Sequence, residues 1–416
     1  MHADQSASKL YQQLSDLLNE LGITKCPARW QTLFPVVMDR FSASGCPPVA
    51  EDTLRQADQQ FRLFPTRLPL ILRGAALIRQ NQALSCYLLL LLAALEDRTA
   101  FYAEWDELEQ PQAAEGEDPL AFDLLPIYLL PPLLPAAAAV WQARQVPWNI
   151  IQRSFSFIEI SLKLHERRVF KPIFDLHDLR WNLNFADNRI LRIGRFNMEI
   201  KPAFPGRIQV FRHRDGRLCT LVDDLRLHRS GFALGSPGYT DEDGAYLAVV
   251  NDEGTFWQGH AVLKDGRAEE QTTALPKNDW QCVLRRDDPV ISVHIPHDDP
   301  LTPDICARAY RETQALMRTC YPDFAYKAFI CFSWLMDPQL RQLLRPNSNI
   351  VRFQERFHPF PSPSSGRGIF RFVFEIEYER LEDLPENTSL ERALKKHYLA
   401  GRYIYEPGGF FFPDEL

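Results

Sequence analysis

Hydrophobic residues in the first part of the chain recur at helical spacing. Near the start, leucines fall three or four positions apart, at Leu10, Leu14, Leu17, Leu18 and Leu21. A second stripe follows Pro147, which suits the first turn of a helix, and consists of Ile150, Ile151, Phe155, Ile158 and Leu162. Residues at this spacing lie on one face of a helix and can be buried together. The pattern predicts a mostly helical domain over residues 1–187.

Beyond residue 188 the pattern changes to short apolar runs separated by turn residues. Asp215-Gly216 lies between the runs Arg207–His213 and Leu218–Leu221, and Lys264-Asp265-Gly266 marks another turn. Asp-Gly and similar pairs favour tight hairpins. We expect an antiparallel meander that begins with Arg189–Ile200, and no repeat is close enough to indicate a propeller or solenoid.

From residue 289 a strand, a helix and a strand follow in order: Pro289–Pro296, Pro303–Cys320 and Lys327–Leu335. Such a unit joins parallel strands and places the end of the first strand beside the start of the helix, where ligands commonly bind. The predicted fold class is therefore α+β. Residues 1–187 form a helical domain, and residues 188–416 form a mixed β-sheet domain flanked by helices.

Composition indicates an ordinary globular protein. Apolar residues make up 45% of the 416 positions and charged residues 24%. A net charge of -7 disfavours a general binder of polyanions, so nucleic acid is not the expected partner. The eight cysteines show no C-x-x-C pair, and the first residues do not resemble a secretory signal. We expect a cytoplasmic protein with free thiols and no metal.

Two apolar runs raise the question of a membrane span. Leu84–Leu95 is shorter than the roughly 20 residues that a spanning helix needs. Leu124–Trp141 is long enough but contains four prolines, which break the backbone hydrogen bonding that lipid requires. Buried helices explain both runs better than a membrane does.

His294 is the first candidate for chemistry. In the strand Pro289–Pro296 it shares one face with Ser292, away from the aliphatic face. A neutral imidazole there could accept the proton that an amine loses when it is acylated. A hydrogen-bonded structural histidine is the alternative, and it stays open.

Thr302-Pro303 is a strong helix start, because the threonine hydroxyl can cap amides and proline fits the first turn. Exposed amides at this end would suit a pyrophosphate. Asp298 and Asp299 lie just before it and would repel a phosphate unless they meet a cation. They could instead hold the ammonium group of an acceptor, or be a solvated turn.

Ser333 and Cys331 share a face of the strand Lys327–Leu335. The Ser333 hydroxyl could donate a proton to a leaving thiolate or bind a thioester carbonyl, although it could equally satisfy local backbone. The apolar neighbours of Cys331 favour an inert thiol. Motifs of serine hydrolases, nucleoside triphosphatases, dinucleotide-binding folds and zinc proteases are absent from the sequence.

Arginines are dense between residues 189 and 229. They are Arg189, Arg192, Arg195, Arg207, Arg212, Arg214, Arg217, Arg226 and Arg229. On adjacent strands some could contact phosphates of a cofactor or of nucleic acid. Solvated strand faces with local salt bridges are the alternative.

Several sequence strings resemble a group of bacterial acyltransferases. The strings are VISVHIP, PLTPDIC, CFSWLMDPQL, NSNIVRFQERFHPFP, LPENTSLERAL and GGFFFP. Each member of the group has a helical N-acyltransferase N-terminal domain and a GNAT-like C-terminal domain. The likeness is strongest from about residue 289 to the end.

The resemblance implies a fold in which acyl-CoA binds between two splayed parallel strands, with the pyrophosphate at the start of the intervening helix. The implied cofactor-binding residues are Ile295, Pro296, Leu301, Thr302 and Asp304. The segment His297–Thr302 departs from the family pattern, because it lacks the Gln/Arg-x-x-Gly-x-Gly/Ala glycines.

The leading hypothesis is therefore an N-acyltransferase that transfers an acyl group, such as acetyl, from acyl-CoA to an amine by direct attack. His294 is expected as base, Ser333 as acid, and Asp298 and Asp299 as residues that bind the amine substrate. A non-catalytic GNAT-like module that binds a protein is the first alternative, and the missing glycines favour it. Nucleic-acid binding through the arginine-rich region is the second.

Overall fold

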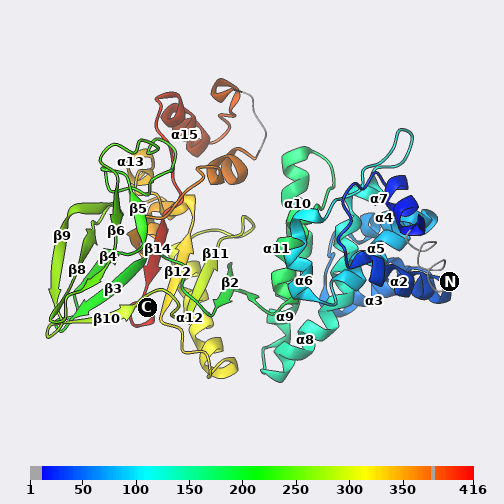
Figure 1. The fold of residues 1–416 in the computed structure, drawn as a ribbon, viewed down its shortest axis with the longest axis horizontal. Coiled ribbons are helices and arrows are strands. Elements are labelled where there is room, and N and C mark those ends of the chain that lie inside the picture. Colours follow the sequence, from blue (N-terminus) through cyan, green and yellow to red (C-terminus); the bar gives the residue numbers. More distant parts are fainter. Residues whose placement is uncertain (1–11, 376–379) are drawn as a thin grey trace, which may run out of the picture. The chain divides into compact units, whose positions relative to one another are not determined.

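The computed structural model describes residues 12–375 and 380–416 of the chain. It divides into two compact units, Met1–Arg189 and Ile190–Leu416. Figure 1 shows helices in the first unit and β-sheets with accompanying helices in the second. The predicted α+β class is confirmed, with a helical N-terminal part followed by a mixed sheet flanked by helices.

The helical unit is organised around one helix that is buried along most of its length. Its longer helices are α2 (Trp30–Ser44), α3 (Glu51–Phe61), α4 (Leu68–Gln80), α5 (Gln82–Ala94), α6 (Arg98–Ala103), α9 (Trp148–Phe155), α10 (Phe157–Val169) and α11 (Leu176–Ala186). Helix α5 begins at Asn81, whose side chain accepts from the Leu84 amide, and it packs against α2 and α4. Because α5 is apolar on every side, it forms the centre of this unit.

The proline-containing apolar run is broken into short helices. They are α7 (Leu120–Asp123), η3 (Leu125–Leu129), η4 (Pro131–Leu133) and α8 (Leu134–Ala143). Leu125–Ala143 meets the length and hydropathy of a membrane span, yet 61% of it is buried inside the protein, and α4 and α5 meet at 107°. Helices buried to this extent belong to the core of the unit, and their burial explains why these segments are apolar.

The second unit contains the predicted strand, helix and strand. Its first sheet has the order β1-β2-β11-β12-β14-β13. The strands are β1 (Ile190–Ile193), β2 (Phe196–Lys201), β11 (Val290–His294), β12 (Ala328–Phe332), β13 (His358–Phe360) and β14 (Gly408–Phe411). Strands β11 and β12 are parallel and joined by α12 (Pro303–Cys320), and the other neighbours are antiparallel. The strand β12 ends three residues before the predicted Leu335, because Trp334–Met336 turns into the 3-10 helix η5.

A second sheet has the order β10-β3-β4-β8-β7, with β9 paired to β8. Its strands are β3 (Ile208–His213), β4 (Leu218–Val222), β7 (Asn251–Asp252), β8 (Phe256–Val262), β9 (Ala268–Pro276) and β10 (Trp280–Leu284), and β5 (Leu225–Leu227) pairs with β6 (Tyr246–Ala248). The predicted Asp215-Gly216 hairpin joins β3 and β4, with Gly216 at φ +95. The meander prediction is wrong for β1 and β2, which join the first sheet because their apolar residues complete its core.

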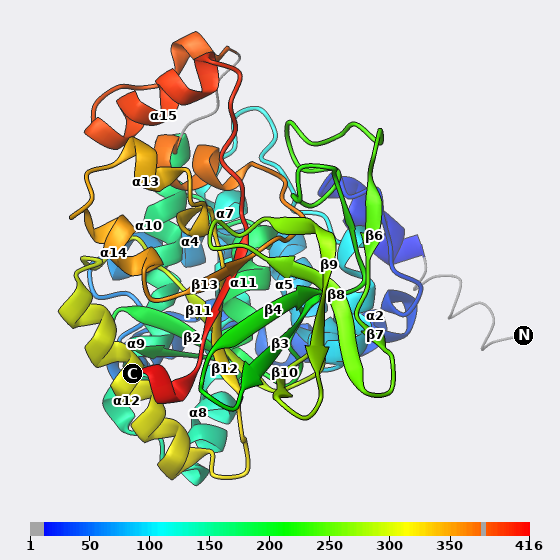
Figure 2. The ribbon, with the colours of Figure 1, turned by 90° about the vertical axis from the view of Figure 1, so that its left-hand side faces the viewer.

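The first sheet is covered on both faces (Figure 2). One face packs against β3 and β10, through Val290, Ile330 and Phe410 against Ile208 and Leu284. The opposite face is covered by α12, whose Tyr310 stacks on Phe196 at 5.1 Å, and by α14 (Asn349–Gln354).

A satellite cluster carries the shorter elements of the C-terminal region. It includes α13 (Leu340–Leu343), the π-helix η6 (Phe370–Phe374), η7 (Leu381–Asp383) and α15 (Ser389–Leu399). Thr388 is the N-cap residue of α15 and forms a capping box with Glu391. The segment Pro361–Gly368 is anchored to this region, because Ser364, Ser365 and Gly368 all donate hydrogen bonds to Glu406.

Candidate functional site

The two parallel strands separate at their carboxyl ends. Pairing between β11 and β12 covers Val290 to Ser292 on one strand and Ala328 to Ile330 on the other. Beyond this point β11 stays with β2, with His294 opposite Asn197, while β12 stays with β14. The last two residues of each strand are therefore not paired with the other strand, and we call this unpaired part of the sheet, which precedes α12 in the chain, the opening.

His294 at this opening pairs with a carboxylate from the neighbouring strand. Its Nε2 lies 2.8 Å from Oε2 of Glu199, and the other Glu199 oxygen accepts from Lys201 Nζ at 2.9 Å. Burial alone would raise the pKa of Glu199, but the hydrogen bond and charge of His294 and the charge of Lys201 lower that pKa to about 2. Glu199 is therefore an ionised, oriented partner of His294.

Glu199 is absent from the residues that the sequence analysis singles out. A signal for it exists, because Asn197, Glu199 and Lys201 alternate with apolar residues along β2. Alternation places these three side chains on one face. It does not reveal that this face continues onto Ser292 and His294, which depends on the pairing of β2 with β11.

Asp298 and Asp299 point at a buried arginine. Arg192 Nη2 lies 2.7 Å from an Asp298 carboxylate oxygen and 3.2 Å from one of Asp299, and the Arg192 side chain is 1% exposed. Two carboxylates beside a buried guanidinium are neutralised in part by it. Their assignment to amine binding stays a prediction, and the structure adds a cation that the sequence analysis did not pair with them.

Arg195 holds the backbone of the same loop. Its Nη2 donates to the carbonyl oxygens of Pro296 at 2.8 Å and Asp299 at 2.6 Å, and its guanidinium lies 5.0 Å from the ring centre of Phe196. Its Nε and Nη1 are buried with no hydrogen-bond partner within residues 12–375 and 380–416. Arg195 thus binds two carbonyl oxygens of the glycine-free loop.

The start of α12 lies directly after this loop. Thr302 is the N-cap residue, as predicted, but its side chain makes no capping hydrogen bond, so that detail of the prediction is wrong. Pro303 occupies the first turn, as expected. Ile295, Pro296, Leu301, Thr302 and Asp304 lie along the strand end, the loop and the first helical turn. Their role in cofactor binding stays a prediction.

A family model described as a GNAT-like C-terminal domain matches residues 190–411. The chain belongs to this family. The match begins where the second compact unit begins, and it contains both the separating strands and the arginine-held loop. We refer to this unit as the GNAT-like domain.

Solved structures with a similar fold are known acyltransferases. One, an acyltransferase in complex with decanoyl-CoA and teicoplanin, is 16% identical with a TM-score of 0.62, over 96% of this chain and 98% of that chain. A mutant acyltransferase in complex with octanoyl-CoA gives the same values. An acyltransferase in complex with decanoyl-CoA is 18% identical with a TM-score of 0.50, over 86% and 99%. At these identities the likeness establishes the fold. No protein of curated function matches the chain significantly.

On the second strand of the opening in the GNAT-like domain, Ser333 follows the last residue of β12. Its Oγ accepts from the Leu335 amide at 3.1 Å and so caps η5, which leaves its proton available to another acceptor. Cys331 lies two residues earlier, within β12, where burial raises the pKa of its thiol to about 12. This supports the expectation that Cys331 is inert. The catalytic role of Ser333 stays a prediction.

Outer arginines of the GNAT-like domain form local ion pairs. The pairs are Arg207 with Asp224, Arg212 with Asp414, Arg214 with Asp279, Arg217 with Asp215, Arg226 with Glu242 and Arg229 with Asp243. Each has a carboxylate partner, as expected of solvated strand faces with local salt bridges. Arg192 and Arg195 differ, because they are buried at the loop before α12.

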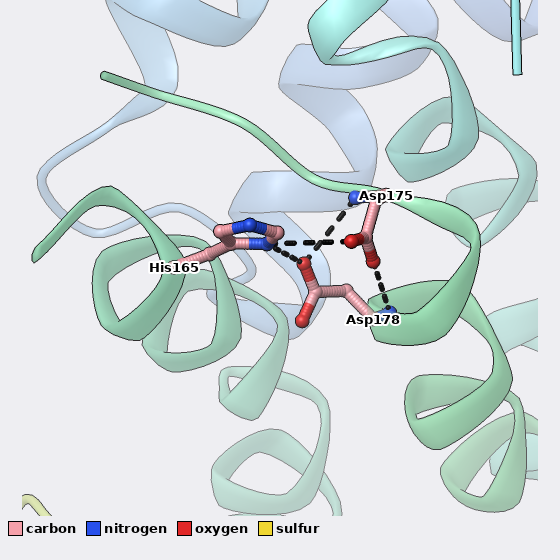
Figure 3. A group of neighbouring side chains, drawn as sticks. All are labelled: His165, Asp175 and Asp178. Atoms are coloured by element: carbon pink, nitrogen blue, oxygen red, sulfur yellow. Dashed lines mark hydrogen bonds and ion pairs between the residues drawn. The ribbon is translucent and has the colours of Figure 1, made fainter. Parts of the chain in front are cut away.

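Outside the GNAT-like domain, His165 of α10 faces two aspartates at the start of α11 (Figure 3). Its Nδ1 lies 2.6 Å from Asp178 Oδ2 and 3.8 Å from Asp175. Two atoms bound to one zinc ion at about 2.0–2.1 Å in a tetrahedral site would lie about 3.3 Å apart, so 2.6 Å is the distance of a hydrogen bond. Asp175 and Asp178 also cap α11 reciprocally, so the group is accounted for as a helix start.

Proposed function

We propose that this protein is an acyltransferase that moves an acyl group from an acyl-CoA to an amine. The observation that carries the proposal is the separation of β11 and β12 beside the start of α12, in a domain of the GNAT-like family. The structures of similar fold support the donor class, since they are acyltransferases in complex with octanoyl-CoA or decanoyl-CoA. One of those complexes also contains teicoplanin.

The loop before α12 can accept a pyrophosphate despite its missing glycines. Arg192 pairs with the two aspartates that would otherwise repel phosphate. Arg195 binds the carbonyl oxygens of Pro296 and Asp299, which would otherwise also be acceptors near the phosphate. The first amides of α12 are not capped by Thr302, so they remain for an anionic ligand at the positive end of the helix. Leu301 and Asp304 would flank the bound group.

His294 and Ser333 border the opening from its two sides and would move the protons of the reaction. The amine nitrogen attacks the thioester carbonyl, so that a C–N bond forms and the C–S bond breaks. His294 takes the proton that the nitrogen loses, and Ser333 gives a proton to the sulfur and regains one from solvent, while His294 returns its proton to solvent. Asp298 and Asp299 would face the incoming amine.

Calorimetry with the full-length protein tests the proposal. We expect acetyl-CoA, octanoyl-CoA, decanoyl-CoA and desulfo-CoA to bind, because all carry the same pyrophosphate. A panel of small and peptide amines, followed by mass spectrometry, would then show an amide product and free CoA thiol in equal amounts. Failure of every CoA compound to bind at millimolar concentration would overturn the proposal. That failure would favour the alternative, a non-catalytic module that has lost cofactor binding and that the glycine-free loop also suggests.

A further inference from the structure

The opening contains a second charged group whose role no sequence motif indicates. Glu199 lies on β2, opposite Ser292 and diagonal to His294, so it reaches the imidazole across one strand. Both of its oxygens have their own donor, one from His294 and one from Lys201. A carboxylate held at both oxygens has a fixed orientation.

We propose that Glu199 is the positioning residue of His294, and that Lys201 holds Glu199 in place. The proposal rests on the proposed function, because it concerns the base of that reaction. Glu199 does not touch the reacting atoms. It acts through the imidazole ring, which it orients at the opening and whose protonated form it stabilises.

The contact sets which ring nitrogen carries the proton. An ionised carboxylate can only accept hydrogen bonds, so the 2.8 Å contact requires a hydrogen on Nε2 of His294. The proton of the attacking amine is then received at Nδ1. When both nitrogens carry protons, the imidazolium lies beside the negative charge of Glu199, which stabilises the state that follows proton transfer.

The surroundings of Glu199 fit this role better than a structural one. Its side chain is 15% exposed, and taking a charge this far from water is costly unless it is paired. Arg192 and Asn197 occupy the same face of the sheet, since Arg192 pairs with Asn197 and Asn197 with His294 across the strands. A polar face on otherwise apolar strands therefore ends at His294, beside the opening.

The chain provides a matched control in the same domain. His358 Nε2 lies 2.8 Å from Glu415 Oε1, so the pair has the same atoms and distance as His294 and Glu199. His358 lies on the edge strand β13, which is separated from β11 by β12 and β14. Glu415→Gln thus removes a carboxylate that makes the same contact with a histidine on another strand of the same sheet.

The experiment compares Glu199→Gln, Glu199→Asp, Lys201→Met and Glu415→Gln by steady-state kinetics, CoA calorimetry and thermal melting. We expect Glu199→Gln to lower kcat about 10- to 100-fold, with the KM and Kd for acyl-CoA within about twofold of wild type. Glu199→Asp should restore part of kcat, Lys201→Met should lower it less, and Glu415→Gln should not change it. A folded Glu199→Gln protein with wild-type kcat would overturn the proposal.

A second readout separates this proposal from the proposed function. In NMR spectra of the protein with ¹⁵N-labelled histidine, the signals missing in His294→Gln belong to His294. We expect them to show a proton on Nε2 in the wild type, and a mixture of tautomers in Glu199→Gln. A proton on Nδ1 alone in the wild type would overturn the positioning role even in an active enzyme. Absence of CoA binding together with the expected tautomer would overturn only the proposed function.

Discussion

The helical unit and the GNAT-like domain each contain a close contact between a histidine and a carboxylate, and the two contacts differ in burial and in the other partner of the carboxylate. In the helical unit His165 lies 2.6 Å from Asp178, and its side chain is 8% exposed. In the GNAT-like domain His294 lies 2.8 Å from Glu199, and its side chain is 31% exposed. Asp178 also caps a helix, whereas Glu199 has Lys201 as its second partner.

A contact between a histidine and a carboxylate does not by itself distinguish a structural pair from a catalytic one, so the two pairs are told apart by their surroundings. His165 and its two aspartates link the consecutive helices α10 and α11, and each carboxylate accepts a hydrogen bond from a backbone amide. His294 lies where two parallel strands part, at the start of a helix with uncapped amides. The proposed function therefore assigns substrate chemistry to the second pair, which is held by the sheet and is the more exposed of the two.

The largest expected effect comes from replacing each histidine. His294→Asn should lower kcat/KM by about 10²- to 10⁴-fold, because a general base contributes roughly that much, and should leave the Kd for CoA within about twofold. His165→Asn should leave kcat unchanged and lower the free energy of unfolding by about 1–3 kcal/mol through the lost buried hydrogen bond. Kinetics, calorimetry and denaturant unfolding measure the three quantities. Equal losses of kcat in both folded variants would remove the distinction between the pairs.

The next largest effect is expected at the loop before α12, which follows the strand of His294 and is the proposed site of the CoA pyrophosphate. Arg192→Met leaves Asp298 and Asp299 without their cation, and because both carboxylates are about a third exposed it should destabilise the protein by about 1–3 kcal/mol, while weakening CoA binding at least tenfold. Adding Asp298→Asn and Asp299→Asn should restore most of the affinity, because no unpaired charge then remains. Calorimetry gives the Kd for CoA of both variants. If the triple variant binds CoA as weakly as Arg192→Met, repulsion by the two aspartates is not the cause of the lost affinity.

The stability that ionised Glu199 contributes to the GNAT-like domain should be lost over a defined range of acidic pH. The pKa of Glu199 falls from an ordinary 4.5 to about 2 in the folded protein, so its contribution is complete above pH 4.5 and is lost as the pH falls toward 2. At about 1.4 kcal/mol for each pKa unit, the wild type should lose about 3 kcal/mol more than Glu199→Gln over that window. Urea unfolding at several pH values tests this. Parallel pH dependence of the two proteins would contradict it.

The smallest effect is expected at the helical pair. Asp175→Ala removes the side chain that accepts from the Asp178 amide, and a lost helix cap costs about 1 kcal/mol. The melting temperature should fall by a few degrees, with kcat and the Kd for CoA unchanged. A loss of activity in this variant would give the helical pair a functional role that its geometry does not indicate.

The strand, helix and strand around the opening could be predicted from the sequence because their signals are local. Helix α12 has the predicted bounds, since its apolar stripe and Pro303 lie within the helix itself. Ser333 shows where local signals end. It continues the extended backbone of β12, yet its side chain caps η5, which begins at the next residue.

The sequence by itself thus determined the two-part organisation, the βαβ unit and the candidates His294 and Ser333, because period-two and helical spacing are properties of neighbouring residues. Only the tertiary structure decided the partners of those candidates. Glu199 precedes His294 by 95 positions, and Arg192 precedes Asp298 by 106. Which of many charged residues meet across such separations depends on strand order and register, which are set by burying both faces of the sheet.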